Sequence, residues 1–272
     1  MTVPSLTFII PVRHPHNARD WGKLRMELAC TIKSIAAQDS DDWQAVIVAN
    51  MGSDLPEIPE GFKVKYVDFP MNDKCDIKAF DPETFYAAVR FDKGRRVLAG
   101  MLDAGETDYF MVVDHDDFVN CHIGSFVSKN KKEGICGWKI FNGYVWGENS
   151  RLLYDYTDFS MFCGTSLIIR REAYALPASV EGADPEYIRS MLGSHVLIQE
   201  ILKKKGSPLE HLPFKGGVYR IGHAGAVSQS PGLFRQFLFN KACLRNPFRF
   251  LYRCTKFRLL TPSLYREFWG AG

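Results

Sequence analysis

The stretch YFMVVDHDD, Tyr109 to Asp117, decides the fold of this 272-residue chain. Its first five residues are apolar, which is typical of a strand buried on both faces of a parallel sheet. Four polar residues follow at once, and three of them are acidic. Because ligands of open α/β sheets bind at the carboxyl ends of the strands, the stretch predicts a polar site there.

The residues before this stretch alternate between strand and helix patterns. Apolar or alternating runs at 6–12, 45–49 and 63–69 predict three further strands. Apolar residues at helical spacing predict helices over 21–38 and 82–102, the second with Asp81 as N-cap and Pro82 in its first turn. This order predicts an α/β fold with a central, mostly parallel sheet flanked by helices.

The second half of the chain is less regular. Residues 135–146, 151–155, 163–171 and 217–221 indicate strands, and 185–205 indicates a helix that stops at Gly206. Ser194 is a candidate N-cap for a helix that begins at His195. The simplest organisation is one domain over 1–230, followed by a C-terminal helical extension over 231–272.

The acidic cluster is a candidate metal site. Asp114, Asp116 and Asp117 lie within four residues, so their carboxylates repel one another. A divalent cation would offset this repulsion and still leave positions for substrate phosphates. An acidic, solvent-exposed turn is the alternative. Neither a GxxxxGK[ST] loop nor a GxGxxG follows the first strand, so P-loop and Rossmann dinucleotide sites are unsupported.

Six segments, taken together and in order, resemble a GT-A glycosyltransferase of the family 2-like, nucleotide-sugar-dependent kind. They are FIIPVR (8–13), VIVANMGSD (46–54), DKGRRVLAGM (92–101), VVDHDD (112–117), CGTSLIIRREA (163–173) and YRIGHAGAVS (219–228). The resemblance implies a GT-A, Rossmann-like fold. It also implies metal-dependent, inverting transfer of a sugar from a UDP- or GDP-sugar to a hydroxyl of a glycan or lipid-linked acceptor, in surface polysaccharide synthesis.

The resemblance assigns roles to individual residues as well. Those implied to bind the donor are Pro11, Val12, Arg13, Asn50, Asp54, Lys93, Arg96, Asp114 and His115. Those implied to hold Mn²⁺ or Mg²⁺ are Asp114 and Asp116, beside Asp117 in the same cluster, with His223 completing the metal or diphosphate site. Asn50 and Met51 replace two acidic residues that the family usually has after its second strand.

The general base departs from the family pattern. The family usually places a Glu-Asp pair, whose Asp is the base, before a helix that ends in K-x-G. Here that place falls at Gly193-Ser194-His195, without a carboxylate. His195 is the candidate base, because a neutral imidazole can accept a hydroxyl proton. Asp184 and Glu186 in the preceding loop compete with it.

Two other functions remain open from the sequence. A nucleotidyltransferase acting on sugar phosphates can share this sheet and its acidic site. A non-catalytic, membrane-associated partner could keep the GT-A-like fold and lack the base.

The net charge of +3 is unevenly distributed. Residues 233–260 hold seven Lys and Arg and no acid, which leaves 27 basic and 31 acidic residues elsewhere. Helices expected over 232–245 and 247–258 would combine these cations with aromatic residues, as helices at anionic membrane surfaces do. A helix packed on the body with solvated arginines is the alternative. No RNA or DNA motif accompanies the segment, so we expect no nucleic-acid partner.

The expected location follows from three further observations. The chain has no apolar run of membrane-spanning length and no secretory signal. Its seven cysteines form no CxxC pair, which favours reduced thiols. We expect a cytoplasmic protein, held at the inner face of the plasma membrane if the basic segment binds lipid.

Overall fold

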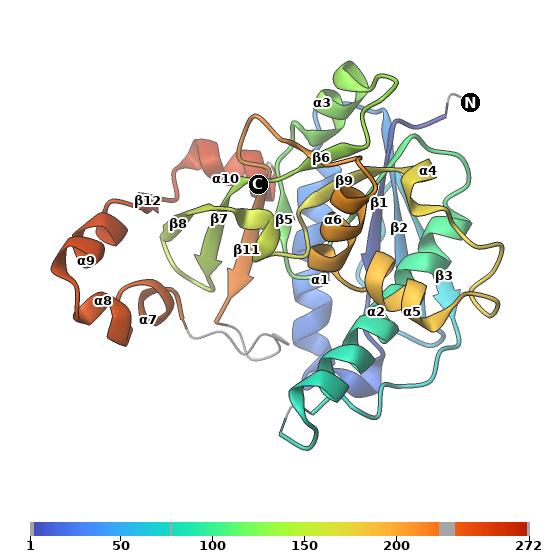
Figure 1. The fold of residues 1–272 in the computed structure, drawn as a ribbon, viewed down its shortest axis with the longest axis horizontal. Helices are drawn as coiled ribbons and strands as arrows, with labels where there is room; N and C mark the ends of the chain where they lie inside the picture. The colour runs from blue at the N-terminus through green and yellow to red at the C-terminus, as the bar shows by residue number, and fades with distance from the viewer. Residues whose placement is uncertain (1–2, 77, 223–231, 271–272) are drawn as a thin grey trace.

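The computed structural model describes residues 3–76, 78–222 and 232–270 (Figure 1). The strands are β1 (Leu6–Pro11), β2 (Trp43–Asn50), β3 (Phe62–Val67), β4 (Tyr109–Val112), β5 (Phe118–Val119), β6 (Gly137–Lys139), β7 (Asn142–Gly147), β8 (Leu152–Thr157), β9 (Leu167–Arg170), β10 (Glu210–His211), β11 (Gly217–Ile221) and β12 (Phe257–Leu259). The helices are α1 (Trp21–Ala36), α2 (Pro82–Asp103), α3 (Ile123–Asn130), α4 (Arg171–Tyr174), α5 (Pro185–Tyr187), α6 (His195–Lys204), α7 (Leu233–Phe237), α8 (Lys241–Leu244), α9 (Pro247–Cys254) and α10 (Pro262–Trp269). Single helical turns are η1 (Pro15–Asn17), η2 (Phe159–Met161) and η3 (Ile188–Leu192).

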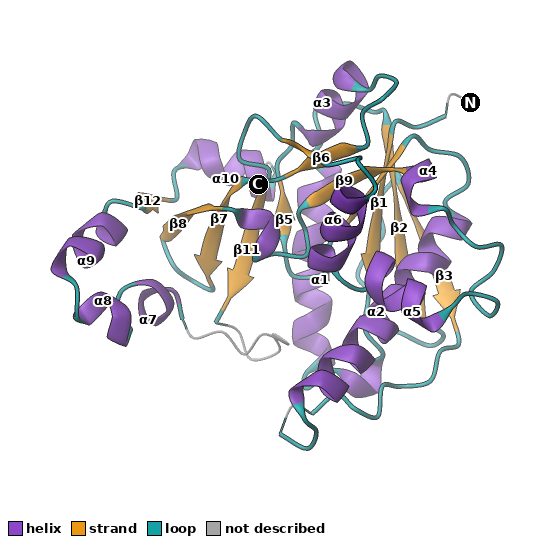
Figure 2. Cartoon of the chain, in the orientation of Figure 1, coloured by secondary structure: helices purple, strands orange, loops and turns teal. Residues whose placement is uncertain are grey.

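The larger sheet has the strand order β10-β6-β9-β4-β1-β2-β3 (Figure 2). Strands β1 to β4 run parallel, whereas β9 is antiparallel to both of its neighbours. In register, Ile9 of β1 lies between Val46 of β2 and Val112 of β4. The expected mixed α/β fold with a mostly parallel central sheet is therefore confirmed.

Helices cover both faces of this sheet because side chains alternate along each strand. Phe8 and Ile10 of β1 belong to a core with the apolar face of α1, which includes Leu28. Ile9 points the other way, into a second core with Val97 of α2 and Ile198 of α6. The N-caps expected and found at Asp81 of α2 and Ser194 of α6 set where these helices begin.

A second sheet, ordered β12-β8-β7-β11-β5, stands beside the first (Figure 1). The C-terminal segment contributes to it, since β12 pairs antiparallel with β8. Phe268 and Trp269 of α10 are buried against Phe118 of β5. Residues 257–269 thus pack on the body, and the boundary at 230/231 stays a prediction. Within the described residues, no helix is both long and apolar enough to cross a bilayer.

Three expected elements differ from the structure. The helix expected over 185–205 is divided into α5, η3 and α6, because the chain at Gly193 passes so close to α2 that a Cβ there would lie 2.1 Å from the Arg90 carbonyl oxygen. The strand expected over 163–171 is shortened to β9 by a turn before it. The two helices expected after residue 231 become the three short helices α7, α8 and α9.

Candidate active site

The carboxyl ends of β1, β2 and β4 meet at one edge of the larger sheet. The residues that follow extend the pairing, with Val12 N donating to Val48 O at 2.9 Å and Val113 N donating to Ile9 O at 2.9 Å. Pro11 and Val12 are buried at this edge, and Arg13 is half-buried. The donor-binding residues predicted after β1 therefore lie next to the acidic stretch that follows β4.

An ion pair joins the acidic stretch to α2. The ammonium of Lys93 lies 2.5 Å from Oδ1 of Asp114, and both side chains are partly exposed. Burial opposes the charged form of Lys93, but the Asp114 carboxylate outweighs it and raises the pKa of Lys93. Gly164 makes this pair possible, since a Cβ there would lie 2.6 Å from Asp114 Oδ2.

Asp117 is turned into the protein. It is fully buried, and its Oδ2 accepts hydrogen bonds from Thr165 Oγ1 at 2.7 Å and Cys163 Sγ at 3.3 Å. Its Oδ1 accepts from the backbone N–H of Arg220 at 3.2 Å. Burial first, and then the carboxylates of Asp116 and Asp114, raise the pKa of Asp117 well above its usual range. These hydrogen bonds of Asp117 connect the segment after β4 with the turn before β9 and with β11.

Asp114 and Asp116 are the carboxylates that best fit a cation. Their side chains remain 30% and 12% exposed. Mg²⁺-type sites use one or two carboxylates and take their other ligands from substrate phosphate and water. Within the described residues, no three His, Cys, Asp or Glu side chains are grouped as a metal site. His223, the fourth predicted ligand, lies outside the described residues.

His115 is buried between two acids. Its Nε2 is 3.9 Å from Glu27 Oε2, and its Nδ1 is 4.0 Å from Asp116 Oδ1. Burial lowers the pKa of His115, and the nearby Arg13 adds to this effect while Asp116 opposes it. The predicted donor-binding residues Arg13 and His115 are thus close enough to influence each other electrostatically.

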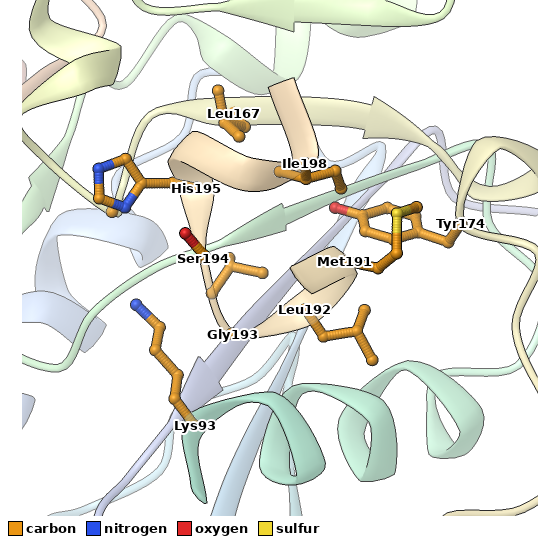
Figure 3. A pocket seen from close by; sticks show the side chains of 11 residues that line it. Lys93, Leu167, Tyr174, Met191, Leu192, Gly193, Ser194, His195 and Ile198 are labelled. Atoms are coloured by element: carbon orange, nitrogen blue, oxygen red, sulfur yellow. The ribbon is translucent and has the colours of Figure 1, made fainter. Parts of the chain in front are cut away.

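His195 faces the same edge from the first turn of α6 (Figure 3). His195, Ser194 and Lys93 line a cavity of about 30 Å³, which holds roughly one water molecule. Among the described residues, the buried Nε2 of His195 has no hydrogen-bond partner. Burial, and then the charge of Lys93, lower the pKa of His195 to about 4. The imidazole is therefore neutral near pH 7, and its Nε2 can act as an acceptor if the proton is on Nδ1.

The competing bases occupy other positions. Asp184 caps α5, where its carboxylate accepts from the backbone N–H groups of Glu186 and Tyr187 at 3.2 and 3.3 Å. Glu186 is exposed and pairs with Arg189 at 3.2 Å. Of the three predicted bases, the structure brings His195 together with the Lys93–Asp114 pair.

The Glu186–Arg189 pair belongs to a surface groove of about 400 Å³ between α2, α5 and α6. Tyr86 and Arg90 of α2 line the same groove. Arg90 is also near enough to His195 to lower the pKa of that imidazole. The groove and the His195 cavity therefore lie near each other, where α2 and α6 both pack on η3.

The predicted donor residues beyond β2 have packing partners. Arg96 is 1% exposed and donates to Asn50 Oδ1 at 2.6 Å and to Asp92 at 3.2 Å. Asn50 in turn donates to Phe69 O at 2.7 Å. Asp54 is exposed and lies 3.6 Å from Nε of Arg25. Arg96 and Asn50 therefore anchor α2 to the end of β2, away from solvent.

Charged residues that the sequence reasoning did not single out continue the site toward the second sheet. Arg220 of β11 lies 2.5 Å from Glu148, which also pairs with Lys23 of α1 at 2.8 Å. Arg220 is 3.8 Å from Glu27, the acid beside His115. Arg220 stands in the quoted segment YRIGHAGAVS, whereas Glu27 and Glu148 come from stretches without a motif. Their proximity to Arg220, and that of Glu27 to His115, arises only in the folded chain.

No family model and no curated protein matches the chain. Solved structures with a similar arrangement include S. aureus TarS, at 12% identity and a TM-score of 0.45, covering 80% of this chain and 37% of that one. S. aureus TarS 1-349 has 12% identity and a TM-score of 0.41, covering 79% and 60%. Rv0371C of Mycobacterium tuberculosis H37Rv, in complex with manganese, has 10% identity and a TM-score of 0.35, covering 80% and 92%. The chain thus spans about 37% of the length of the first structure.

Proposed function

We propose that this protein transfers a sugar from a nucleoside-diphosphate sugar to a hydroxyl of a glycan or lipid-linked acceptor. The observation that carries the proposal is the convergence of Asp114, Lys93 and His195 at the carboxyl edge of the parallel strands. This is where ligands of open α/β sheets bind. The GT-A resemblance of the segments around these residues supports the same reaction.

Each residue has a distinct task in this reaction. The Lys93 ammonium faces the place where the leaving diphosphate gains charge, and a fixed cation stabilises charge that develops in the transition state. His195 Nε2 accepts the proton of the acceptor hydroxyl. If His195 lies opposite the leaving diphosphate, a single displacement inverts the anomeric carbon. Its low pKa keeps it neutral for this role, though it makes the imidazole a weaker base than an ordinary one.

A divalent cation, Mn²⁺ or Mg²⁺, would be held by Asp114 and Asp116. When bound, it would neutralise charge on the diphosphate as a Lewis acid. Because Lys93 already pairs with Asp114, cation binding requires the ammonium to turn toward the diphosphate. Asp117 takes no part, since its oxygens are occupied by Thr165, Cys163 and Arg220.

The groove beside His195 is the proposed acceptor site. Tyr86 is 41% exposed and offers an aromatic surface to a sugar ring, and Arg90 offers a donor fork to an anionic group. Both come from α2, within two turns of Lys93. A glycan whose hydroxyl reached His195 could therefore rest along α2.

The test is turnover on a panel of UDP- and GDP-sugars with Mn²⁺ or Mg²⁺ and mixed glycan acceptors, measured as nucleoside diphosphate release. Asp116→Asn is expected to abolish release, whereas Asp41→Asn, at an exposed loop position, should leave it unchanged. Pyrophosphate release from a nucleoside triphosphate and a sugar phosphate would establish the nucleotidyltransferase reaction instead. Nucleotide binding by calorimetry, without turnover on any acceptor, would establish a non-catalytic protein.

A further inference from the structure

The helix α9 presents an apolar face to solvent. Phe248, Leu251 and Tyr252 are 84%, 62% and 62% exposed. Their spacing of three and four residues places them on one side of the helix. No residue of α9 is buried. A soluble surface normally scatters its exposed apolar side chains, so this cluster indicates a surface that something covers.

The neighbouring elements also carry exposed apolar side chains. Phe239, Leu244 and Leu259, which lie before α8, in α8 and in β12, are 58%, 64% and 67% exposed. In Figure 1, α7, α8 and α9 form an arc at the far end of the molecule, beyond the second sheet. The arc therefore offers several apolar side chains at one end of the protein.

Contacts on the inner side of the arc hold it to the body. Arg253 donates to the carbonyl oxygen of Phe237 at 2.8 Å, which ties α9 to α7. The ring of Phe237 stacks on Tyr154 of β8, with centroids 3.9 Å apart. After α9 the chain returns to the second sheet through β12. These contacts fix which side of α9 faces inward, so the exposure of its apolar side is a property of the fold.

The positive charge of the arc favours an anionic partner. The same segment carries exposed cations, and residues 233–260 contain no acid. The exposed cations are Arg235, Lys241, Arg245, Arg249 and Arg258. Two copies of this surface would repel each other, whereas an anionic bilayer attracts the cations and accepts the apolar side chains.

We propose that α9 and its neighbours dock the protein on the surface of an anionic membrane. Phe248, Leu251 and Tyr252 enter the boundary between headgroups and acyl chains, and the cations contact lipid phosphates. With eight residues, α9 is about 12 Å long, so it lies in the plane of the surface and does not cross it. Docking is independent of the proposed transferase activity.

Flotation of the full chain with vesicles tests the proposal. Binding is expected to phosphatidylcholine vesicles that contain about 30% phosphatidylglycerol, to fall with added salt, and to be weak on phosphatidylcholine alone. Phe248→Glu should lower the partition coefficient at least about tenfold, because a buried Phe side chain is replaced by a charge that anionic lipid repels. Met26→Glu, at a position in α1 that is 66% exposed, is the matched control and should bind as the wild type does.

A second pair of variants tests the contribution of the cations to membrane binding. Arg249→Glu should lower binding at least about fivefold at low salt, whereas Lys204→Glu, on the exposed side of α6, should change it little. Thermal melts of all four variants should match the wild type, since each position is exposed. Absence of wild-type binding, or equal binding by Phe248→Glu, would overturn the proposal. Self-association of the wild type that Phe248→Glu abolishes, without vesicle binding, would overturn it in favour of an interface between copies.

Discussion

Acidification is expected to destabilise the fold through His195. Burial, and then the neighbouring Lys93, lower the pKa of this imidazole from 6.5 to about 4 in the folded protein. Below pH 6.5 the unfolded chain takes up a proton that the folded chain refuses until about pH 4. The free energy of unfolding is therefore unaffected by His195 above about pH 6.5. It falls as the pH drops from 6.5 to about 4, and the loss is complete below pH 4.

The magnitude follows from the size of the pKa shift. A shift of this size corresponds to about 3 kcal/mol in full, of which about 2 kcal/mol arises between pH 7 and pH 5. Urea unfolding at pH 7, 6 and 5 measures it, with His195→Asn as the variant that lacks the titrating group. The wild type should lose about 2 kcal/mol more than His195→Asn over this range.

The design separates His195 from the other histidines. His14 and His115, whose pKa values burial also lowers, contribute equally to the wild type and the variant, so the difference isolates His195. Met26→Asn, at a position in α1 that is 66% exposed, is the matched control and should follow the wild type, because no titrating group is removed. Parallel stability curves for the wild type and His195→Asn would refute the reasoning, because His195 would then titrate alike in the folded and unfolded chains.

Three substitutions probe the carboxyl edge of the sheet. Lys93→Met should lower kcat on the order of 10²–10³, as loss of a group that stabilises transition-state charge does, and steady-state rates near wild type would contradict this role. Gly164→Ala would place a Cβ 2.6 Å from Asp114 Oδ2, so it should lower turnover while changing Tm little. Turnover at the wild-type level would show that the Lys93–Asp114 pair tolerates the displacement. Asp117→Ala should lower the free energy of unfolding by about 2–3 kcal/mol, because three donors lose their acceptor. Asp41→Ala, at an exposed position, should lower it by less than about 0.5 kcal/mol, and equal losses in urea titrations would contradict the structural role of Asp117.

The local patterns predict the first half of the fold well. The apolar runs that become β1, β2 and β4 have a hydrophobic pattern that a parallel sheet covered on both faces requires. Asp81 and Ser194 act as N-caps because a short polar side chain next to a helical pattern satisfies backbone N–H groups locally. Such features depend on neighbours within a few residues, so a single sequence reveals them.

The sequence patterns did not predict those elements that depend on contacts between distant parts of the chain. The break between η3 and α6 depends on the close approach of Gly193 to α2, about a hundred residues earlier. The short strand β5 and the helix α10 pack on each other across the molecule, and neither has a strong pattern of its own. These elements are stabilised by tertiary contacts that no local pattern contains.

From sequence alone, the stretch YFMVVDHDD determined a buried strand with a polar site at its end, because apolar periodicity and the sudden acidic run are local properties. The tertiary structure decided how the carboxylates divide their tasks. Asp117 turns inward because Thr165 and Cys163, from the turn before β9, and Arg220 of β11 converge on it. Asp114 stays at the edge because α2 brings Lys93 to it. Three aspartates that look equivalent in the chain differ in the fold, because hydrogen bonding and burial depend on neighbours that only folding assembles.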